Sequence, residues 1–166
     1  MSTPKASAGH AKADKLACQP FADLLSVSSA VVPRTFVDRS VVEAGNPKAP
    51  VRLRLVSYAP GDAERVLEAI TTAVGACGGG FKASDSDAST QFTVKADPIA
   101  YGGEEPLGVW LTPAVGGGKL PIDIWVIRTN GVLAYFSTVD LPEDPYRAMP
   151  TEVVSAQVGK MAVAVG

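Results

Sequence analysis

Two runs of apolar and β-branched residues, separated by Asn130-Gly131, dominate the hydrophobic pattern of residues 120–139. This pattern predicts a β-hairpin with a two-residue type I′ turn, in which both central residues adopt positive φ. The resulting register places Trp125 opposite Phe136 on one face, and Val126 opposite Tyr135 on the other. Because both faces are largely apolar, we expect the hairpin in the middle of a sheet, with each face at least partly covered.

Other segments have the composition or the period-two alternation of strands. Residues 51–58 alternate between Val or Leu and polar positions, and residues 90–96 alternate in the same way. Residues 31–43 are rich in Val, Thr and Phe, and residues 107–112 lead towards the hairpin. Because successive strands are joined by short loops, we expect a single antiparallel sheet of about five to six strands.

Helical spacing of apolar residues occurs near both ends of the chain and in its middle. The strongest helix follows the turn at residues 59–61, with Asp62 as the expected N-cap, and ends at the glycines 78–80. A shorter helix is expected within residues 13–27, and another begins near Pro150. The fold class is therefore α+β, with the helices packed mainly on one face of the sheet.

Length and charge limit the domain organisation and the choice of partners. With 166 residues the chain suits one domain, which we place at residues 14–166. Residues 1–13 are polar and are expected to form a disordered tail or a cloning remnant. The formal net charge of −2 argues against binding to nucleic acid or an anionic membrane. No apolar run reaches the roughly 18 residues of a transmembrane helix.

Cys18 and Cys77 are the only cysteines in the sequence. Cys77 lies on the apolar stripe of the strongest predicted helix, where a reduced cysteine can serve as a small buried hydrophobic residue. We favour a disulfide between the two, which would join the first helix to the strongest one. The start of the chain has no hydrophobic signal-peptide core, so the chain is either cytosolic or its export signal has been removed.

Candidate catalytic chemistry is limited by the presence of a single histidine, His10, in the polar tail. It excludes a zinc site with several imidazoles, and any histidine-based triad, within one chain. We predict neither a metal nor a cofactor, and no catalytic residue. A carboxylate-based hydrolase is the remaining enzymatic hypothesis, with Asp97, Glu105 and Asp123 as its acids. We expect Asp123 to be a solvated acid near an edge or a turn.

Short signatures are spread over most of the chain: Cys18 to Leu24, the helix ending from Ala73 to Phe81, Gly103-Glu104-Glu105, Ile127 to Phe136, and Pro150 to Lys160. Together they resemble a family of secreted actinobacterial lipoproteins of unknown function. The chain is also distantly similar to the extracellular sensor domains of actinobacterial Ser/Thr kinases. The family's usual loop is closer to Gly-Asp-Glu, so Gly103-Glu104 departs from it. The resemblance implies an exported, disulfide-bonded α+β domain of a membrane-anchored lipoprotein, whose anchor is absent from this sequence.

These observations favour a non-catalytic extracytoplasmic binding or sensor-like domain, with a groove on the sheet face opposite the helices. Its ligand would be a small molecule, a cell-wall component or a protein. The alternative is an assembly module that forms a homodimer, or binds a partner, through an apolar sheet face or edge. The candidate ligand-binding residues are Tyr101, Glu104, Glu105, Trp110, Trp125 and Tyr135.

Overall fold

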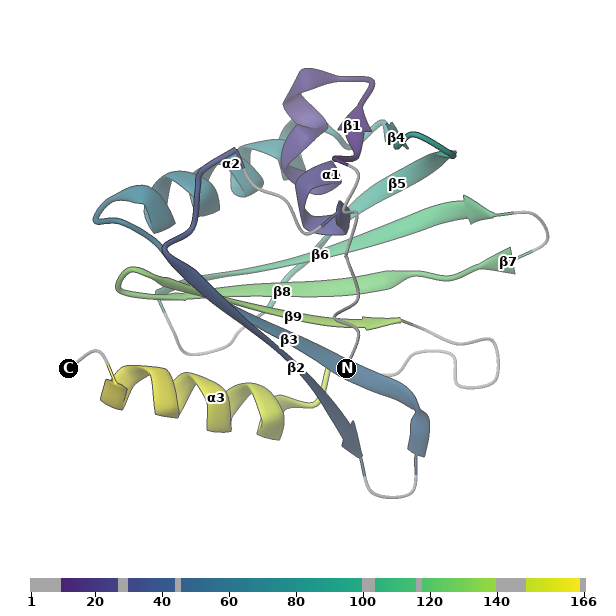
Figure 1. Ribbon diagram of the computed structural model, residues 1–166. Coiled ribbons are helices and arrows are strands. Elements are labelled where there is room, and N and C mark those ends of the chain that lie inside the picture. The colour runs from purple at the N-terminus through teal and green to yellow at the C-terminus, as the bar shows by residue number, and fades with distance from the viewer. Residues whose placement is uncertain are drawn as a thin grey trace, which may run out of the picture.

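The computed structural model describes residues 10–26, 30–43, 46–99, 104–115, 118–139 and 149–164. They form one antiparallel sheet with helices on both of its faces (Figure 1). The strands are β1 (Lys12–Ala13), β2 (Thr35–Glu43), β3 (Asn46–Ser57), β4 (Phe81–Ser84), β5 (Ser89–Asp97), β6 (Glu104–Val115), β7 (Gly118–Lys119), β8 (Ile122–Thr129) and β9 (Val132–Val139). The helices are the 3-10 helix η1 (Leu16–Cys18), α1 (Gln19–Ser26), α2 (Asp62–Ala76) and α3 (Thr151–Ala164).

The predicted α+β class and antiparallel sheet are confirmed, but the sheet is larger than the five to six strands expected. Eight strands lie in the order β1-β4-β5-β6-β8-β9-β3-β2, and β7 pairs with β6 beside this path. The strands β1, β4 and β7 are not among those expected from the sequence, because strands of two to four residues are too short to show an alternating pattern. β1 lies at the end of the segment expected to be a tail.

The central hairpin, formed by β8 and β9, has the predicted register. Trp125 lies opposite Phe136, and Val126 lies opposite Tyr135. The hairpin lies between β6 and β3, so its expected place in the middle of the sheet is confirmed. The turn differs from the expected type I′, because Asn130 has a φ of 52° whereas Gly131 is not in the left-handed region.

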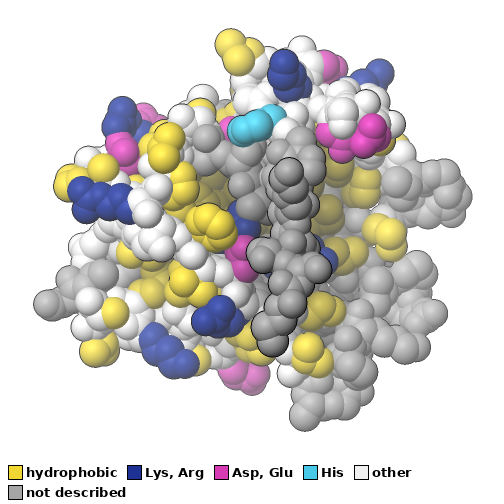
Figure 2. Space-filling view, viewed as in Figure 1, with side chains coloured by type: hydrophobic (Ala, Val, Ile, Leu, Met, Phe, Trp, Pro, Cys, Tyr) yellow, Lys and Arg dark blue, Asp and Glu magenta, His cyan; other side chains and the backbone are white. Residues whose placement is uncertain are grey.

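The pair of strands β2 and β3 extends the sheet beyond the hairpin. β3 pairs with β9, and β2 pairs with β3 at the end of the sheet. Seen from the same side as in Figure 1, hydrophobic side chains lie among charged ones where β2 and β3 cross the lower part of the molecule (Figure 2). The centre of the sheet differs, because Val126, Ile127 and Ala134 of the hairpin are completely buried.

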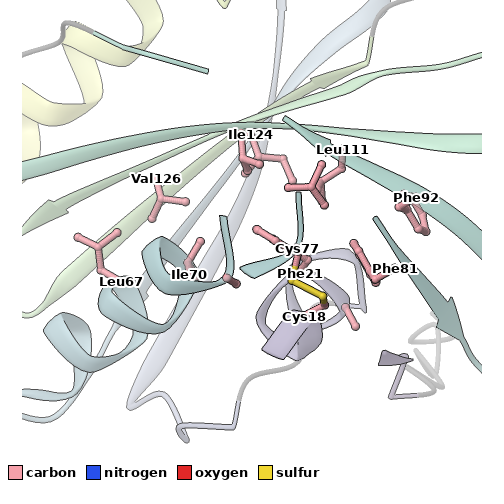
Figure 3. Packing of buried hydrophobic residues seen from close by; sticks show 14 of the residues in the cluster. Cys18, Phe21, Leu67, Ile70, Cys77, Phe81, Phe92, Leu111, Ile124 and Val126 are labelled. Carbon is pink, nitrogen blue, oxygen red and sulfur yellow. A yellow bond between two sulfur atoms is a disulfide. The ribbon is translucent and has the colours of Figure 1, made fainter. Parts of the chain in front are cut away.

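The helices α1 and α2 cover one side of the sheet, which we call the disulfide face. The predicted disulfide is present and joins Cys18, just before α1, to Cys77, at the end of α2. Beside it, the rings of Phe21, Phe81 and Phe92 form a stack with centroid distances of 5.9 and 5.4 Å. Figure 3 shows side chains of the sheet meeting those of α2 next to this stack. The disulfide therefore joins the two helices where the core is completely buried.

The third helix, α3, packs on the opposite side of the sheet (Figure 1). Its buried residues Val154 and Met161 belong to a cluster with Ile127, Ala134 and Phe136 of the hairpin. The expectation that the helices pack mainly on one face therefore holds for α1 and α2 but is wrong for α3. The physical reason is that the hairpin is apolar on both faces, and each apolar face is stabilised by burial.

Candidate functional site

Two rows of side chains cross β5, β6 and β8 on the side of the sheet that α3 occupies. In the first row Lys95 lies opposite Trp110, and Trp110 lies opposite Asp123. In the second row Asp97 lies opposite Gly108, and Gly108 lies opposite Trp125. Directly opposite residues in a sheet project from the same face. We call this surface the tryptophan face, comprising Lys95, Asp97, Trp110, Asp123 and Trp125.

The indole of Trp125 is held in place across the neighbouring strand. Its Nε1–H donates a hydrogen bond of 3.0 Å to Oδ2 of Asp97. Because Gly108 lies between these residues in the register, the indole has to extend past a position that carries no side chain. A Cβ atom at Gly108 would lie only 2.5 Å from the carbonyl oxygen of Asp97 and 3.1 Å from its Cβ. Glycine at this position therefore permits the close approach of the strands that positions Trp125.

Trp110 and Asp123 form the other part of the tryptophan face. Trp110 is half-buried, and among the described residues it belongs to neither hydrophobic cluster. Asp123 is only 2% exposed and lies opposite Thr138, which is also 2% exposed. The expectation that Asp123 is a solvated acid is therefore wrong. It lies within β8, in the interior of the sheet, rather than at an edge or turn.

Tyr135 lies on the disulfide face, opposite to the two tryptophans. Its phenolic oxygen is 3.3 Å from that of Tyr58, and either hydroxyl can donate the hydrogen bond. Burial, followed by the proximity of Tyr58, raises the pKa of Tyr135 above its ordinary value, so its phenol stays neutral. Tyr135 is therefore not part of one site with Trp110 and Trp125, although the sequence analysis grouped them.

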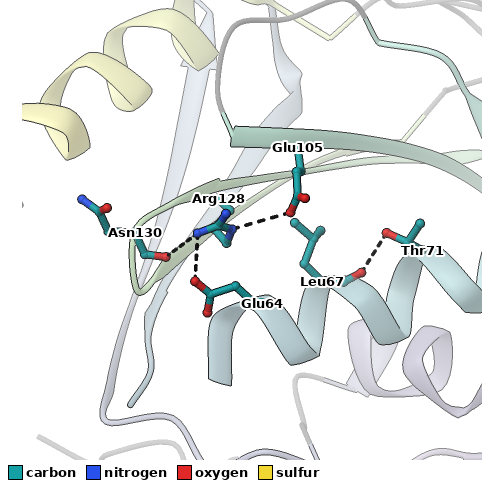
Figure 4. A network of polar contacts seen from close by, with 6 residues as sticks. All are labelled: Glu64, Leu67, Thr71, Glu105, Arg128 and Asn130. Atoms are coloured by element: carbon teal, nitrogen blue, oxygen red, sulfur yellow. Dashed lines mark hydrogen bonds and ion pairs between the residues drawn. The ribbon is translucent and has the colours of Figure 1, made fainter. Parts of the chain in front are cut away.

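Glu105 belongs to a network of charged groups around Arg128, shown in Figure 4. The guanidinium of Arg128 donates to Glu64 of α2 at 3.0 Å, and its Nε lies 3.8 Å from the carboxylate of Glu105. Arg128 also donates a hydrogen bond of 3.4 Å to the backbone carbonyl of Asn130. Glu105 has a φ of 54°, an unfavourable conformation for a residue with a side chain. The network connects β6, α2 and the hairpin turn, which is a structural role.

The structure does not describe the side chains of two of the predicted ligand-binding residues. Tyr101 lies outside the described residues. For Glu104 the structure defines the backbone, which pairs with Arg128, but not the side chain. Their predicted role stays a prediction.

Two residues that organise these sites are not among the predicted ligand-binding residues. Asp97 was expected only as a possible catalytic acid, and Gly108 had no predicted role. A glycine within a strand is a signal for close backbone approach, so Gly108 could have been recognised from the sequence. The contact of Arg128 with Glu64 joins residues 64 positions apart, and no local pattern indicates such a contact.

The described residues show which chemical groups are present on the two faces of the sheet. Within them, no group of three or more His, Cys, Asp and Glu residues could hold a metal ion. Cys18 and Cys77 are bonded to each other, so neither is a thiol nucleophile. The tryptophan face combines two half-buried indole rings with the half-buried carboxylate of Asp97, whereas the carboxylate of Asp123 is buried. In the ranges that the structure describes, no helix is both long and apolar enough to cross a membrane.

The fold is similar to that of one domain whose crystal structure is known. The structure is similar to the crystal structure of the extracellular domain of PknH from Mycobacterium tuberculosis, with a TM-score of 0.57 and 12% sequence identity. The similarity covers 92% of this chain and 74% of the PknH domain. The predicted distant similarity to kinase sensor domains is thus confirmed at the level of the fold. No family model matches the sequence, and no curated protein matches it.

Proposed function

We propose that this chain is a non-catalytic, extracytoplasmic binding domain of the sensor type, and that the tryptophan face is its ligand-binding surface. The similarity to the PknH extracellular domain supports the sensor-like role. The buried disulfide supports a location outside the cytoplasm, because disulfides persist mainly in oxidising compartments.

The hydrogen bond between Trp125 and Asp97 is the observation on which the ligand surface depends. It orients an aromatic ring before a ligand arrives, so less conformational entropy is lost on binding. Trp110 provides a second half-buried ring on the adjacent strand, and Asp97 provides a half-buried carboxylate as acceptor, whereas Asp123 is buried. We therefore expect a compact ligand with a flat apolar face and hydroxyl or amine donors. A small molecule or a cell-wall component satisfies this description.

The proposal extends to a membrane-anchored lipoprotein of an actinobacterial cell envelope, on the basis of the sequence resemblance. Cys18 is not the site of lipid attachment in this proposal, because its sulfur is bonded to Cys77 and it is completely buried. The disulfide instead makes Cys18 part of the core.

A fragment screen by nuclear magnetic resonance tests the ligand surface. The chain contains two tryptophans, so their two indole N–H signals report directly on the tryptophan face. The probes are a defined library of small saccharides and aromatic amines. We expect binding fragments to shift both indole signals, and Trp110→Ala to weaken their binding by up to roughly tenfold, the loss expected for one aromatic contact.

Tyr135→Phe is the matched control, because it alters an aromatic residue on the disulfide face. It should leave the affinity of the same fragments unchanged. Fragments that shift the signals of Tyr58 and Tyr135 instead, or that bind equally well to Trp110→Ala, would contradict the proposed surface.

A further inference from the structure

The edge strand β2 exposes a long row of side chains at the end of the sheet. It contains nine residues, and in the described part of the chain no strand pairs with its outer side. Phe36, Val37 and Val42 are 57%, 40% and 51% exposed, although all three are large hydrophobic residues. Long edge strands with exposed apolar residues are templates for pairing with another strand.

The two edges of the sheet differ in how they are protected. At the opposite edge, β1 has two residues, one of them Lys12, and short or charged edge strands resist pairing. β2 contains charges as well, but Asp38 is bound by Arg54 of the adjacent strand through two hydrogen bonds of 2.6 Å. The same guanidinium lies 5.2 Å from the ring centroid of Phe36. The carboxylate of Asp38 is thus neutralised within its own chain.

The side chains of β2 form a nearly palindromic pattern around Arg39. Two apolar residues, Phe36 and Val37, lie on one side of the centre, and two valines, 41 and 42, lie at the matching distance on the other. Asp38 and Ser40 flank the centre. An antiparallel pair of identical strands places residues at equal distances from the centre opposite each other.

We propose that β2 binds β2 of a second copy of this chain, in an antiparallel pairing with its two-fold axis at Arg39. Val37 then lies opposite Val41 in two symmetric pairs, and Phe36 lies at the level of Val42, where the pairing of β2 with β3 is irregular. The palindromic pattern is the reason for choosing a second copy over a foreign strand. The two Arg39 side chains meet at the axis and repel each other, so association should strengthen as salt screens them.

Cysteine cross-linking tests this register. Directly opposite Cα atoms in an antiparallel pair are about 4.5 to 5.5 Å apart, a separation that a disulfide can span. Arg39→Cys should therefore form a covalent dimer with itself under mild oxidation. Val37→Cys should not, because Val37 lies opposite Val41. Cys18 and Cys77 do not interfere, since both are completely buried and bonded to each other.

Val32→Cys is the matched control, because Val32 is 82% exposed and lies outside β2. Arg39→Cys that forms no more dimer than Val32→Cys overturns the proposal. A Val37→Cys dimer that forms faster than the Arg39→Cys dimer overturns the register and with it the two-fold axis at Arg39.

Sedimentation of the chain without introduced cysteines measures the association independently. The wild type should show a concentration-dependent monomer–dimer equilibrium, and Val37→Lys should weaken it by roughly tenfold because it adds charges at a paired apolar position. Val163→Lys, at an 85% exposed position on α3, should leave the equilibrium unchanged. A wild type that stays monomeric at every concentration overturns the proposal and leaves the edge to a foreign strand. None of these outcomes depends on ligand binding at the tryptophan face.

Discussion

The two faces of the sheet are built in contrasting ways. The disulfide face is closed by two helices, a disulfide and a stack of phenylalanines, and its central residues are completely buried. On the other side, α3 packs against the hairpin, while Trp110 and Trp125 remain only partly buried beside polar groups. Both faces therefore contain a buried core, but the core under α3 is the smaller one and Trp110 lies outside it.

Removing the disulfide should have the largest effect on stability. The bridge joins residues 59 positions apart, and the chain-entropy model assigns about 4 kcal/mol to a loop of this size. We expect the double substitution Cys18→Ala and Cys77→Ala to lower the free energy of unfolding by about this amount, measured by urea denaturation. A reductant should destabilise the wild type and leave the double variant unchanged. Equal free energies of unfolding for the wild type and the double variant would mean that the disulfide does not stabilise the disulfide face.

Gly108→Ala should have the next largest effect and should act on the tryptophan face. The new Cβ atom conflicts with backbone and side-chain atoms of Asp97, so the strands must move apart and the hydrogen bond to Trp125 is disturbed. We expect a loss of about 1–3 kcal/mol in the free energy of unfolding, together with a shift in tryptophan fluorescence.

Gly159→Ala is the control for this substitution. Gly159 lies within α3, and a Cβ atom there has no atom within 4 Å. Because alanine favours the helical conformation more than glycine does, the free energy of unfolding of this variant should rise by up to about 1 kcal/mol. A Gly108→Ala protein that is as stable as the wild type would show that close approach of the strands is not required there.

Replacing the two tryptophans should separate their roles. Trp125→Phe removes the donor to Asp97, and we expect the free energy of unfolding to fall by about 1 kcal/mol. Trp110→Phe should cost less than about 0.5 kcal/mol, since Trp110 belongs to neither described hydrophobic cluster. Urea denaturation of both variants makes the comparison. Equal losses would mean that Trp110 is as much a part of the fold as Trp125.

The smallest effect concerns acid stability at the exposed margin of the disulfide face. The hydrogen bond from Arg54, supported by its charge, lowers the pKa of Asp38 below its usual value of 3.8. The carboxylate therefore stabilises the folded state above this pH, and the contribution is lost as the pH falls through the lower folded value. Because Asp38 is 53% exposed, solvent screening limits the contribution to less than about 1 kcal/mol.

Asp38→Asn should accordingly be slightly less stable than the wild type at pH 6, and the difference should shrink as the pH falls below 3.8. Urea denaturation at several pH values measures it. Arg54→Met should give a similar loss, and combining the two substitutions should add little, since both remove the same interaction. If the difference in stability between Asp38→Asn and the wild type grows as the pH falls, the pKa of Asp38 is not lowered by folding.

Part of the candidate site was already present in the sequence pattern. The predicted register put Trp125 and Tyr135 on opposite faces of the hairpin, and the structure confirms it. Grouping them in one site ignored this alternation. The position of Asp97 beside Trp125 required the pairing of β5 with β6 and of β6 with β8, and only then does Gly108 fall between them.

Local patterns determined the hairpin register, the helical segments and the α+β class, because side-chain alternation and turn residues act over a few positions. The pattern also favoured the disulfide. Only the tertiary structure decided that β3 pairs with β9, that β2 lies at the edge, and that α3 covers the second face. These choices depend on which apolar surfaces meet in three dimensions. Burial is non-directional, so many pairings satisfy the same local pattern, and packing of the whole chain selects one of them.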